Sequence, residues 1–417
     1  MERNVPKLRF KGFNDEWENK KLGEFLTFYS TNSFSRDCLN YENGDAQNIH
    51  YGDIHMKFPT ILDTEKYNIP YINSDINISK YSEESFCKDG DLVIADASED
   101  YADIGKSIEV CNIGNKKILA GLHTILARDN KLVTVNGFKG YMMQSESVRK
   151  QVKVLAAGAK VLGISKSNLE KVNVKLPSLQ EQERISNFLT KVDKIIEKQD
   201  EKVKNLEKYK KGMMQKIFSQ EIRFKDENGE EYPEWEEARL NNVLSISEKI
   251  KTEIIEKDKL LTVKLHMQGI KVNKNVDTLN IGATVYYKRK AGQFIYGKQN
   301  FFNGAFGIVP EELDGYLSSG DIPALNINRD RIIPEYLINY IGRTEFYKKT
   351  ENLSSGTGSK RIHEKTLLEI VINIPCVAEQ ERIANFLSNI DLVIDKENKK
   401  LEELKRWKKG LLQQMFV

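Results

Sequence analysis

The residues best suited to metal and redox chemistry are few and scattered in this sequence. There are five histidines: His50, His55, His123, His266 and His363. There are four cysteines: Cys38, Cys87, Cys111 and Cys376. No histidine stands at metal-ligand spacing from a cysteine or carboxylate, and no Cys-x-x-Cys pair occurs. The pattern argues against a metal site and indicates a reducing compartment, where thiols stay free.

Motifs of nucleotide and cofactor chemistry are missing as well. The sequence has no Walker A motif and no Gly-x-Gly-x-x-Gly after a strand. The segment "NIPY" at 68–71 resembles the Asn-Pro-Pro-Tyr motif of amino-methyltransferases, but no glycine-rich cofactor loop precedes it. We interpret it as an ordinary turn. The sequence therefore predicts no catalytic residue, no cofactor-binding residue and no metal ligand.

The length and composition of the chain limit the number of domains and the class of protein only broadly. The chain has 417 residues, 40% of them hydrophobic, and its 64 basic and 61 acidic residues leave a net charge of +3. This length suits two or three domains, and any basic binding surface must be local. No apolar run reaches the roughly 20 residues that span a bilayer, and the first residues lack a signal-peptide core. We expect a cytoplasmic protein.

A long internal repeat organises the chain. "EQERISNFL" begins at Glu181 and "EQERIANFL" begins at Glu379, 198 residues later. The copies align without a gap over 181–218 and 379–416, with 18 of 38 positions identical. A shorter repeat opens each unit, because "LRFKGFNDEWE" at Leu8 matches "IRFKDENGEEYPEWE" at Ile222 in its Arg-Phe and Glu-Trp-Glu residues. Each unit is thus an opening segment, a variable body and a charged tail.

The tails carry the pattern of long helices. Their apolar residues recur at steps of three and four, with Lys and Glu on the remaining faces. Ser178 and Glu181 fit a capping box just after Pro177. Gly212 and Gly410 either end the helices or let two helices cross closely.

A helix of this length extends about 57 Å at 1.5 Å per residue, and a lone apolar stripe would be exposed to water. We therefore expect each tail to pack on the other as an intramolecular coiled coil, which is antiparallel if a pseudo-twofold axis relates the two units. The bodies alternate β-rich runs such as "GDLVIA" and "GQFIYG" with turns and short helical stretches. The prediction is an α+β chain with two tandem bodies, separated by two long helices and related by a pseudo-twofold axis.

These features resemble the specificity subunit of type I restriction–modification systems. The resemblance rests on "VPKLRFKGFNDEWENKKLGEFL", on "LPSLQEQERI" and "IPCVAEQERI", and on the twin tails, and it covers the whole chain. It divides the chain into an opening segment with target-recognition domain 1 (1–177), a central helix (178–220), an opening segment with target-recognition domain 2 (221–375) and a C-terminal helix (376–417). Cys376 at the second cap position and the longer second opening segment depart from the pattern.

The resemblance implies a non-catalytic subunit that reads double-stranded DNA in bacterial defence. Each target-recognition domain is expected to read one half of a bipartite, asymmetric site. The helices are expected to space the halves and to dock two copies of a modification subunit, which uses S-adenosylmethionine for DNA methylation. Two restriction subunits would supply translocation and cleavage driven by ATP with Mg²⁺. The alternatives are a tandem scaffold that binds no nucleic acid and a self-contained methyltransferase.

Candidates for DNA contact are polar and basic residues on the predicted loops of each body. In the first body they are Asn48, His50, Tyr51, His55, Lys57, Lys106, Lys160, Ser165 and Lys166. In the second they are His266, Gln268, Lys271, Lys288, Arg289, Lys290, Lys298, Gln299, Asn300, Asn303, Lys360, Arg361 and His363. Each is alternatively a solvated surface residue. Tyr209 and Trp407 are candidates for partner docking, or alternatively part of the coil core.

Overall fold

The computed structural model describes residues 5–29, 31–158, 160–252, 256–274, 284–356 and 360–417. The chain forms two compact units, and each combines one body with parts of both long helices. Unit 1 comprises Met1–Glu201 and Lys399–Val417, and unit 2 comprises Lys202–Asn398. The division therefore falls within the long helices rather than at their ends.

Unit 1 is built on a mixed five-stranded sheet in the order β2-β11-β7-β9-β5. Its strands are β2 (Leu26–Tyr29), β11 (Thr124–Asp129), β7 (Leu92–Ala95), β9 (Ser107–Cys111) and β5 (Ile61–Asp63). A four-stranded sheet consists of β10 (Ile118–Ala120), β4 (Gln47–Ile49), β6 (Tyr71–Ile72) and β3 (Leu39–Asn40). A small ribbon pairs β12 (Leu162–Gly163) with β8 (Ala97–Ser98). The helices of the body are α1 (Leu22–Phe25), α2 (Tyr51–Met56), α3 (Phe138–Gln144), α4 (Glu146–Leu155) and α5 (Lys166–Leu169).

Unit 2 has a smaller central sheet in the order β15-β22-β19-β20. Its strands are β15 (Leu244–Ile246), β22 (Ala324–Ile327), β19 (Phe294–Tyr296) and β20 (Phe306–Ile308). Two antiparallel ribbons pair β16 (Leu261–Val263) with β17 (Ile270–Val272), and β18 (Tyr286–Lys288) with β21 (Leu317–Ser319). The helices of the body are α7 (Pro334–Ile341), α8 (Thr344–Lys349) and α9 (Glu364–Leu368).

The same antiparallel ribbon closes both bodies. In unit 1, β1 (Glu18–Lys21) pairs with β13 (Asn173–Leu176), and in unit 2, β14 (Glu236–Arg239) pairs with β23 (Val371–Ile374). Glu18 lies opposite Leu176, and Glu236 lies opposite Ile374, so the registers are equivalent. Each ribbon thereby holds the opening segment beside the strand that leads into a long helix.

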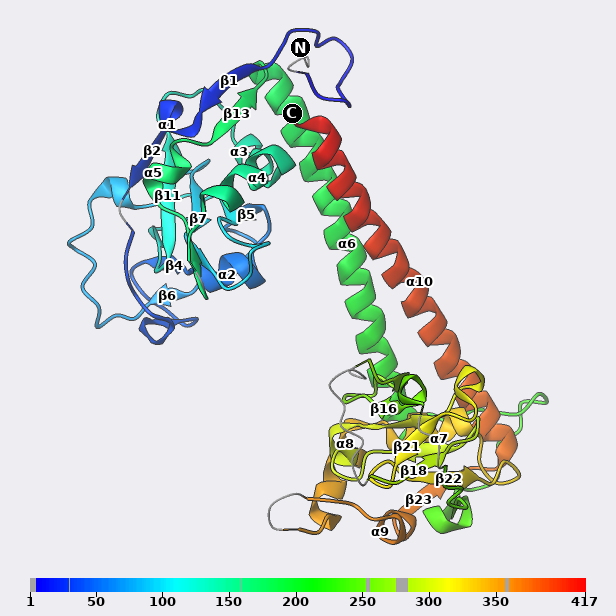
Figure 1. Cartoon of the computed structure of the whole chain (residues 1–417). Helices are drawn as coiled ribbons and strands as arrows, with labels where there is room; N and C mark the ends of the chain where they lie inside the picture. Colours follow the sequence, from blue (N-terminus) through cyan, green and yellow to red (C-terminus); the bar gives the residue numbers. More distant parts are fainter. Residues whose placement is uncertain (1–4, 30, 159, 253–255, 275–283, 357–359) are drawn as a thin grey trace. The chain divides into compact units, whose positions relative to one another are not determined.

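The long helices are α6 (Leu179–Phe218) and α10 (Val377–Met415), drawn in green and red in Figure 1. They run antiparallel within each unit, as predicted. In unit 1, Lys408 Nζ lies 2.6 Å from an Asp193 carboxylate oxygen. In unit 2, Lys210 Nζ lies 2.6 Å from an Asp391 carboxylate oxygen, the equivalent contact. No helix in the described ranges is long and apolar enough to cross a membrane.

Both alternatives for the tail glycines are wrong. The helices continue past Gly212 to Phe218 and past Gly410 to Met415. A Cβ atom added at either glycine would meet nothing within 4 Å, so neither glycine permits a close helix crossing. The capping box is only half present, because the Glu181 N–H lies 3.4 Å from Ser178 Oγ while its carboxylate binds another partner.

The core of unit 1 includes residues from the far end of the sequence. Leu411, Leu412, Met415 and Phe416 are buried in the same cluster as Trp17. The rings of Trp17 and Phe416 meet edge to face at 6.1 Å. The last turn of α10 is therefore part of the first body's core.

Candidate nucleic-acid interface

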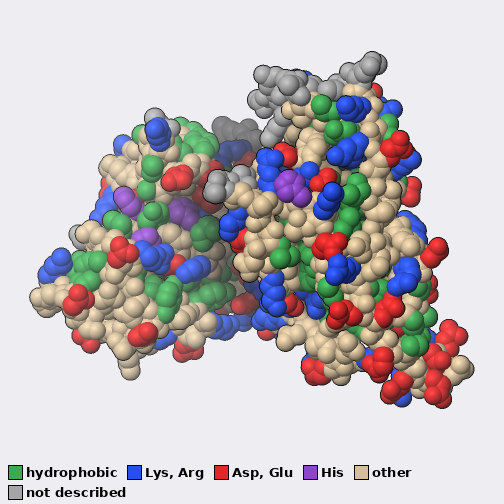
Figure 2. Space-filling view, turned by 90° about the horizontal axis from the view of Figure 1, so that it is seen from below, with side chains coloured by type: hydrophobic (Ala, Val, Ile, Leu, Met, Phe, Trp, Pro, Cys, Tyr) green, Lys and Arg blue, Asp and Glu red, His purple; other side chains and the backbone are tan. Residues whose placement is uncertain are grey.

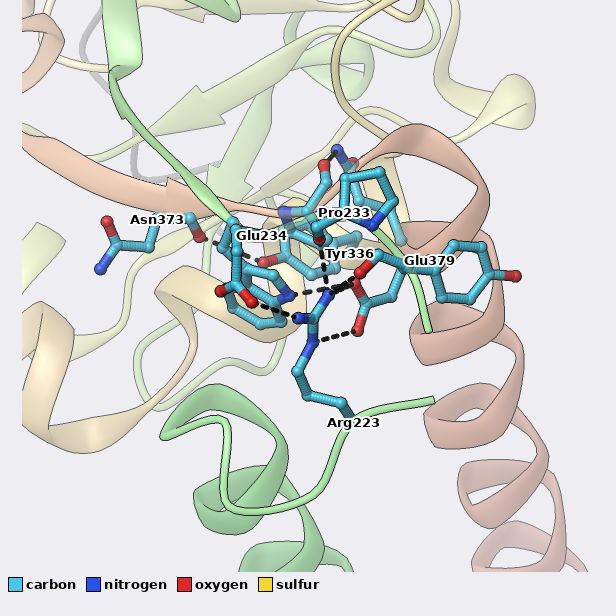
Figure 3. Close-up of polar contacts among 10 residues, drawn as sticks. Arg223, Pro233, Glu234, Tyr336, Asn373 and Glu379 are labelled. Atoms are coloured by element: carbon cyan, nitrogen blue, oxygen red, sulfur yellow. Dashed lines mark hydrogen bonds and ion pairs between the residues drawn. The ribbon is translucent and has the colours of Figure 1, made fainter. Parts of the chain in front are cut away.

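The two repeated sequence motifs meet in the structure. In unit 1, Arg9 donates from both Nε and Nη2 to the two Glu181 carboxylate oxygens, each at 2.7 Å. In unit 2, Arg223 contacts Glu379 in the same way, at 3.3 and 2.8 Å. Figure 3 shows this second junction, where Glu379 also accepts a hydrogen bond from Trp235 Nε1 at 3.1 Å. We call each of these the Arg–Glu junction.

The glutamine that follows each glutamate ties the long helix to its body. The Gln380 side-chain oxygen accepts from the Ile333 N–H at 2.9 Å, and its nitrogen donates to the Pro375 carbonyl at 2.9 Å. Gln182 makes the equivalent bonds in unit 1, to the Val135 N–H and the Pro177 carbonyl. Bidentate pairs and buried amides of this kind fix orientation. The junctions thus form one repeated frame that holds each body against a helix start.

Candidate residues of unit 1 gather around the short helix α2. His50 caps it, because its Nδ1 accepts a hydrogen bond from the Gly52 N–H at 3.1 Å. The ring of Tyr51 lies 4.7 Å from that of His50, 6.1 Å from that of His55 and 5.4 Å from that of His123. Burial, and then the nearby Arg36 guanidinium, lowers the pKa of His50, which favours the neutral imidazole that the cap requires.

The cations near α2 already have protein partners. Lys57 lies 3.1 Å from the buried Asp53 carboxylate, and Arg36 lies 2.7 Å from the same group. Lys106 Nζ donates to the His55 carbonyl at 2.7 Å. These contacts hold the cluster of rings in place and reduce the charge available for DNA phosphates.

The remaining candidates of unit 1 lie elsewhere. Asn48 is fully buried in β4, where its side chain faces Asn32, so its expected place on a DNA-contacting loop is wrong. Ser165 caps α5, and Lys166 donates to the Tyr29 carbonyl at 2.9 Å. Lys160 is exposed.

In unit 2, the three basic residues at the end of β18 and just after it are not all exposed. Lys288 and Lys290 are exposed, but Arg289 between them is only 2% exposed. Arg289 donates to Ser318 Oγ at 2.6 Å and to the Ile322 carbonyl at 2.9 Å, and burial lowers its pKa to about 10. Its expected role at the surface is wrong, because these hydrogen bonds hold its guanidinium inside the body.

Other cations of unit 2 are paired with carboxylates. Lys298 lies 3.1 Å from Glu364, and Lys360 lies 2.7 Å from Glu351. Arg361 lies 3.2 Å from an Asp321 oxygen. Four further candidates are Gln299 beside Arg361, Asn300 and Asn303, which are hydrogen-bonded to each other, and the exposed His363.

The ribbon of β16 and β17 carries the last three candidates of unit 2. His266, Gln268 and Lys271 are all exposed on this ribbon. Figure 2 shows histidine side chains among lysines and arginines on the surface of both units.

The long helices leave matching apolar positions uncovered. Trp407 is 46% exposed and Ile195 is 49% exposed in unit 1. Their equivalents in unit 2, Tyr209 and Val393, are 52% and 44% exposed. Trp407 contacts Phe188 edge to face at 6.4 Å. Both aromatic residues therefore lie at the rim of the coil, with half of each side chain open.

A family model decides what kind of protein this frame belongs to. The model for the type I restriction modification DNA specificity domain matches twice, over residues 14–208 and 209–406. The chain belongs to this family. Both matches join a body to long-helix residues, and their shared boundary lies inside α6.

Curated relatives agree with this assignment to the specificity subunits. The chain is 25% identical over 323 residues to the type I restriction enzyme MjaVIII specificity subunit of Methanocaldococcus jannaschii, covering 72% of this chain and 73% of the relative. It is 25% identical over 308 residues to the putative MjaX specificity subunit of the same organism, covering 71% and 70%.

Solved structures show the same fold. An S subunit of a type I restriction–modification system from M. genitalium matches with a TM-score of 0.55 at 12% identity, covering 99% of both chains. A chain from a study of complex assembly and conformational transition of the type I R-M system matches with a TM-score of 0.57 at 15% identity, covering 97% of this chain and 98% of that one.

The sequence patterns did not predict the two Arg–Glu junctions. Glu181 and Glu379 were assigned only to helix starts, and Arg9 and Arg223 only to opening segments. Both motifs are duplicated with the same residue types, which was a signal that they belong to one structural feature.

Within the described residues, no group of three or more His, Cys, Asp and Glu side chains is placed to hold a metal ion.

Proposed function

We propose that this specificity subunit reads a bipartite, asymmetric DNA site, with unit 1 contacting one half and unit 2 the other. The observation that carries the proposal is the pair of equivalent Arg–Glu junctions holding two dissimilar bodies. A repeated frame suits a shared task, while bodies with different sheets and different exposed residues suit two different half-sites. DNA recognition separates in the same way into orienting contacts and base-specific contacts.

The partners in this proposal are two copies of a modification subunit. The matching open positions support it, because Ile195 and Trp407 in unit 1 are repeated as Val393 and Tyr209 in unit 2. A groove of about 630 Å³ in unit 1 is lined by Phe10, Phe13, Arg184 and Phe188 among others, and Phe188 contacts Trp407. Half-exposed aromatic residues are typical anchors of protein interfaces. Methylation with S-adenosylmethionine, and cleavage driven by ATP with Mg²⁺, would belong to the partner subunits.

Exchange of one body tests the reading of half-sites. Residues 22–176 would be replaced by the corresponding body of another specificity subunit, and the DNA methylated in cells would be sequenced. We expect one half of the methylated site to change and the other half to persist. A change in both halves would contradict the assignment of one half to each unit.

Salt dependence separates this proposal from a scaffold that binds no nucleic acid. The complex with the modification subunit should bind its own site more tightly than unrelated DNA, and the affinity should fall steeply with salt as counterions are released. A complex with no sequence preference would favour the scaffold.

Docking is tested by Trp407→Ala and Tyr209→Ala. Each variant should weaken the binding of one modification subunit, so that titration shows one tight and one weak site instead of two tight ones. The control is Leu353→Ala, since Leu353 is 50% exposed but belongs to the short turn Thr350–Leu353 of the second body and not to a long helix. Equal stoichiometry and affinity in all three variants would refute this docking surface.

The helices are proposed to set the spacing between the half-sites. Both α6 and α10 contribute residues to both units. Removal of one heptad from each helix should therefore change or abolish the permitted spacing in a library of sites. Unchanged spacing would show that another feature sets it.

A further inference from the structure

The turn between β16 and β17 has an unusual backbone for its sequence. The ribbon pairs Val263 with Ile270, and the Gln268 N–H donates to the Leu265 carbonyl at 3.2 Å across the turn. The two central residues, His266 and Met267, have φ angles of 55° and 60°. Two positive φ angles in the centre of a hairpin are typical of a type I′ turn, which strongly prefers Asn-Gly. A histidine and a methionine there hold a strained conformation.

The surrounding structure accounts for the methionine but not for the histidine. The Met267 side chain lies over Gly342, where an added Cβ would come within 2.4 Å of the Met267 Cε. The turn is also clamped through its main chain, because the His266 N–H donates to the Asn303 carbonyl and the Met267 N–H donates to the Gly304 carbonyl, both at 2.9 Å. Any residue supplies those N–H groups. Packing and clamping therefore explain the position of the turn and leave the His266 imidazole unexplained.

The two polar side chains of the turn differ from several cations of unit 2 in having no hydrogen-bond or ion-pair partner among the described residues. Lys298, Lys360 and Arg361 each face a carboxylate. The side chains of His266 and Gln268 are exposed and make no hydrogen bond or ion pair within the part of the chain that the structure describes. They are thus polar groups open to solvent, on a turn whose main chain is clamped to the body. Preorganised groups of this kind lose little freedom when they bind.

The ribbon of β16 and β17 is a kind of element that can enter the major groove of DNA. A two-stranded β-ribbon is one of the elements that the major groove of B-DNA admits. The glutamine amide matches the paired acceptor and donor of adenine, and an imidazole can donate or accept at a base edge. Lys264 and Lys271 are exposed on the flanks of the same ribbon, where phosphates would lie.

We propose that the turn at residues 265–268 is the base-reading element of unit 2, entering the major groove so that His266 and Gln268 contact bases of one half-site. This rests on the proposed reading of one half-site by each unit and names the residues that discriminate there. On this proposal the imidazole side chain gives His266 its function, while the turn geometry alone would favour glycine.

His266→Gly separates the role of the imidazole side chain from the role of the backbone conformation of the turn. His266→Gly removes the imidazole and also suits the positive φ, so the unit should be as stable as the native protein or more stable. The matched control is Gln220→Gly, because Gln220 is in unit 2 with a φ of 60° but lies after α6, outside the ribbon. Gln268→Ala removes the second proposed contact.

The experiment measures binding of the full complex, with its modification subunit, to its own site and to every single-base variant of that site. We expect His266→Gly and Gln268→Ala each to lose about 10- to 100-fold of discrimination at one or two bases in one half-site, as for a lost base contact. Discrimination in the other half-site, and all binding by Gln220→Gly, should be unchanged. Urea unfolding should show that none of the three variants is less stable.

Three results would overturn the inference. Full discrimination in both variants would show that the turn does not read bases. An equal loss on every sequence would assign it to phosphate contact. A native complex with no sequence preference would refute the proposed function itself, and the native measurement reveals that outcome before any variant is compared.

Discussion

Arg223→Ala should destabilise unit 2 strongly, because it leaves a buried carboxylate without its cation. Glu379 is fully buried, and it receives two hydrogen bonds from Arg223 and one from Trp235. Removing one partner of a buried pair costs about 3–5 kcal/mol. The Arg223 side chain is 20% exposed and the indole donor remains, so we expect the lower end, about 3 kcal/mol.

A second substitution tests the cause. Glu379→Gln in the Arg223→Ala background removes the uncompensated charge but keeps an oxygen for the Trp235 N–H. The double variant should therefore recover most of the loss, with a coupling free energy of about 2 kcal/mol. Arg239→Ala is the matched control in the same unit, because its ion pair with Glu369 is 59% and 56% exposed and should contribute under about 1 kcal/mol.

Native-state amide exchange during urea titration measures these effects in β14 and β23 specifically, which matters in a chain of two compact units. The reasoning fails if Arg223→Ala costs no more than Arg239→Ala. It also fails if Glu379→Gln deepens the loss instead of relieving it.

Three further outcomes are expected. Gly212→Ala and Gly410→Ala should each stabilise the protein by about 1 kcal/mol in thermal unfolding, because both glycines lie inside helices with open space around them; a lower melting temperature would show a hidden contact. The lowered pKa of His50 means that its stability contribution is complete above about pH 6.5 and falls as the pH drops from 6.5 through the folded value. His50→Asn keeps a capping oxygen, so urea midpoints between pH 7.5 and 5.5 should depend less on pH than in the native protein. Lys210→Glu should cost about 1 kcal/mol and Asp391→Lys in the same chain should restore it, since the two groups form an ion pair; no recovery would show that the pair is incidental.

Local patterns in the sequence predicted the regular elements well. The spacing of apolar residues located α6 and α10, and short helical stretches such as α3 and α4 are present in the bodies as expected. The pairing of the helices followed from the need to cover an apolar stripe, and their antiparallel direction followed from the pseudo-twofold axis that the repeat predicts. The positions of the helices depend only on residues within a few turns of each other.

Contacts that depend on distant parts of the chain were out of reach. Arg9 and Glu181 are 172 residues apart, and only the folded ribbon of β1 and β13 brings them together. The same limit explains Asn48 and Arg289, whose polar side chains look suited to DNA but are buried against other segments of the chain. Asn48 faces Asn32, and Arg289 binds Ser318 and Ile322. The predictions for Gly212 and Gly410 were wrong for another reason. A helix tolerates a glycine at a modest cost in stability when the neighbouring turns hold it.

The burial of Leu411, Leu412, Met415 and Phe416 in the core of unit 1 has a consequence for synthesis on the ribosome. A nascent chain emerges from its N-terminus, so the first body has to wait for almost the whole protein before its apolar core is covered. During that time its unfinished core is available to chaperones and proteases. A stop codon that removed residues 399–417 would therefore damage the first body to be made and leave the last one intact.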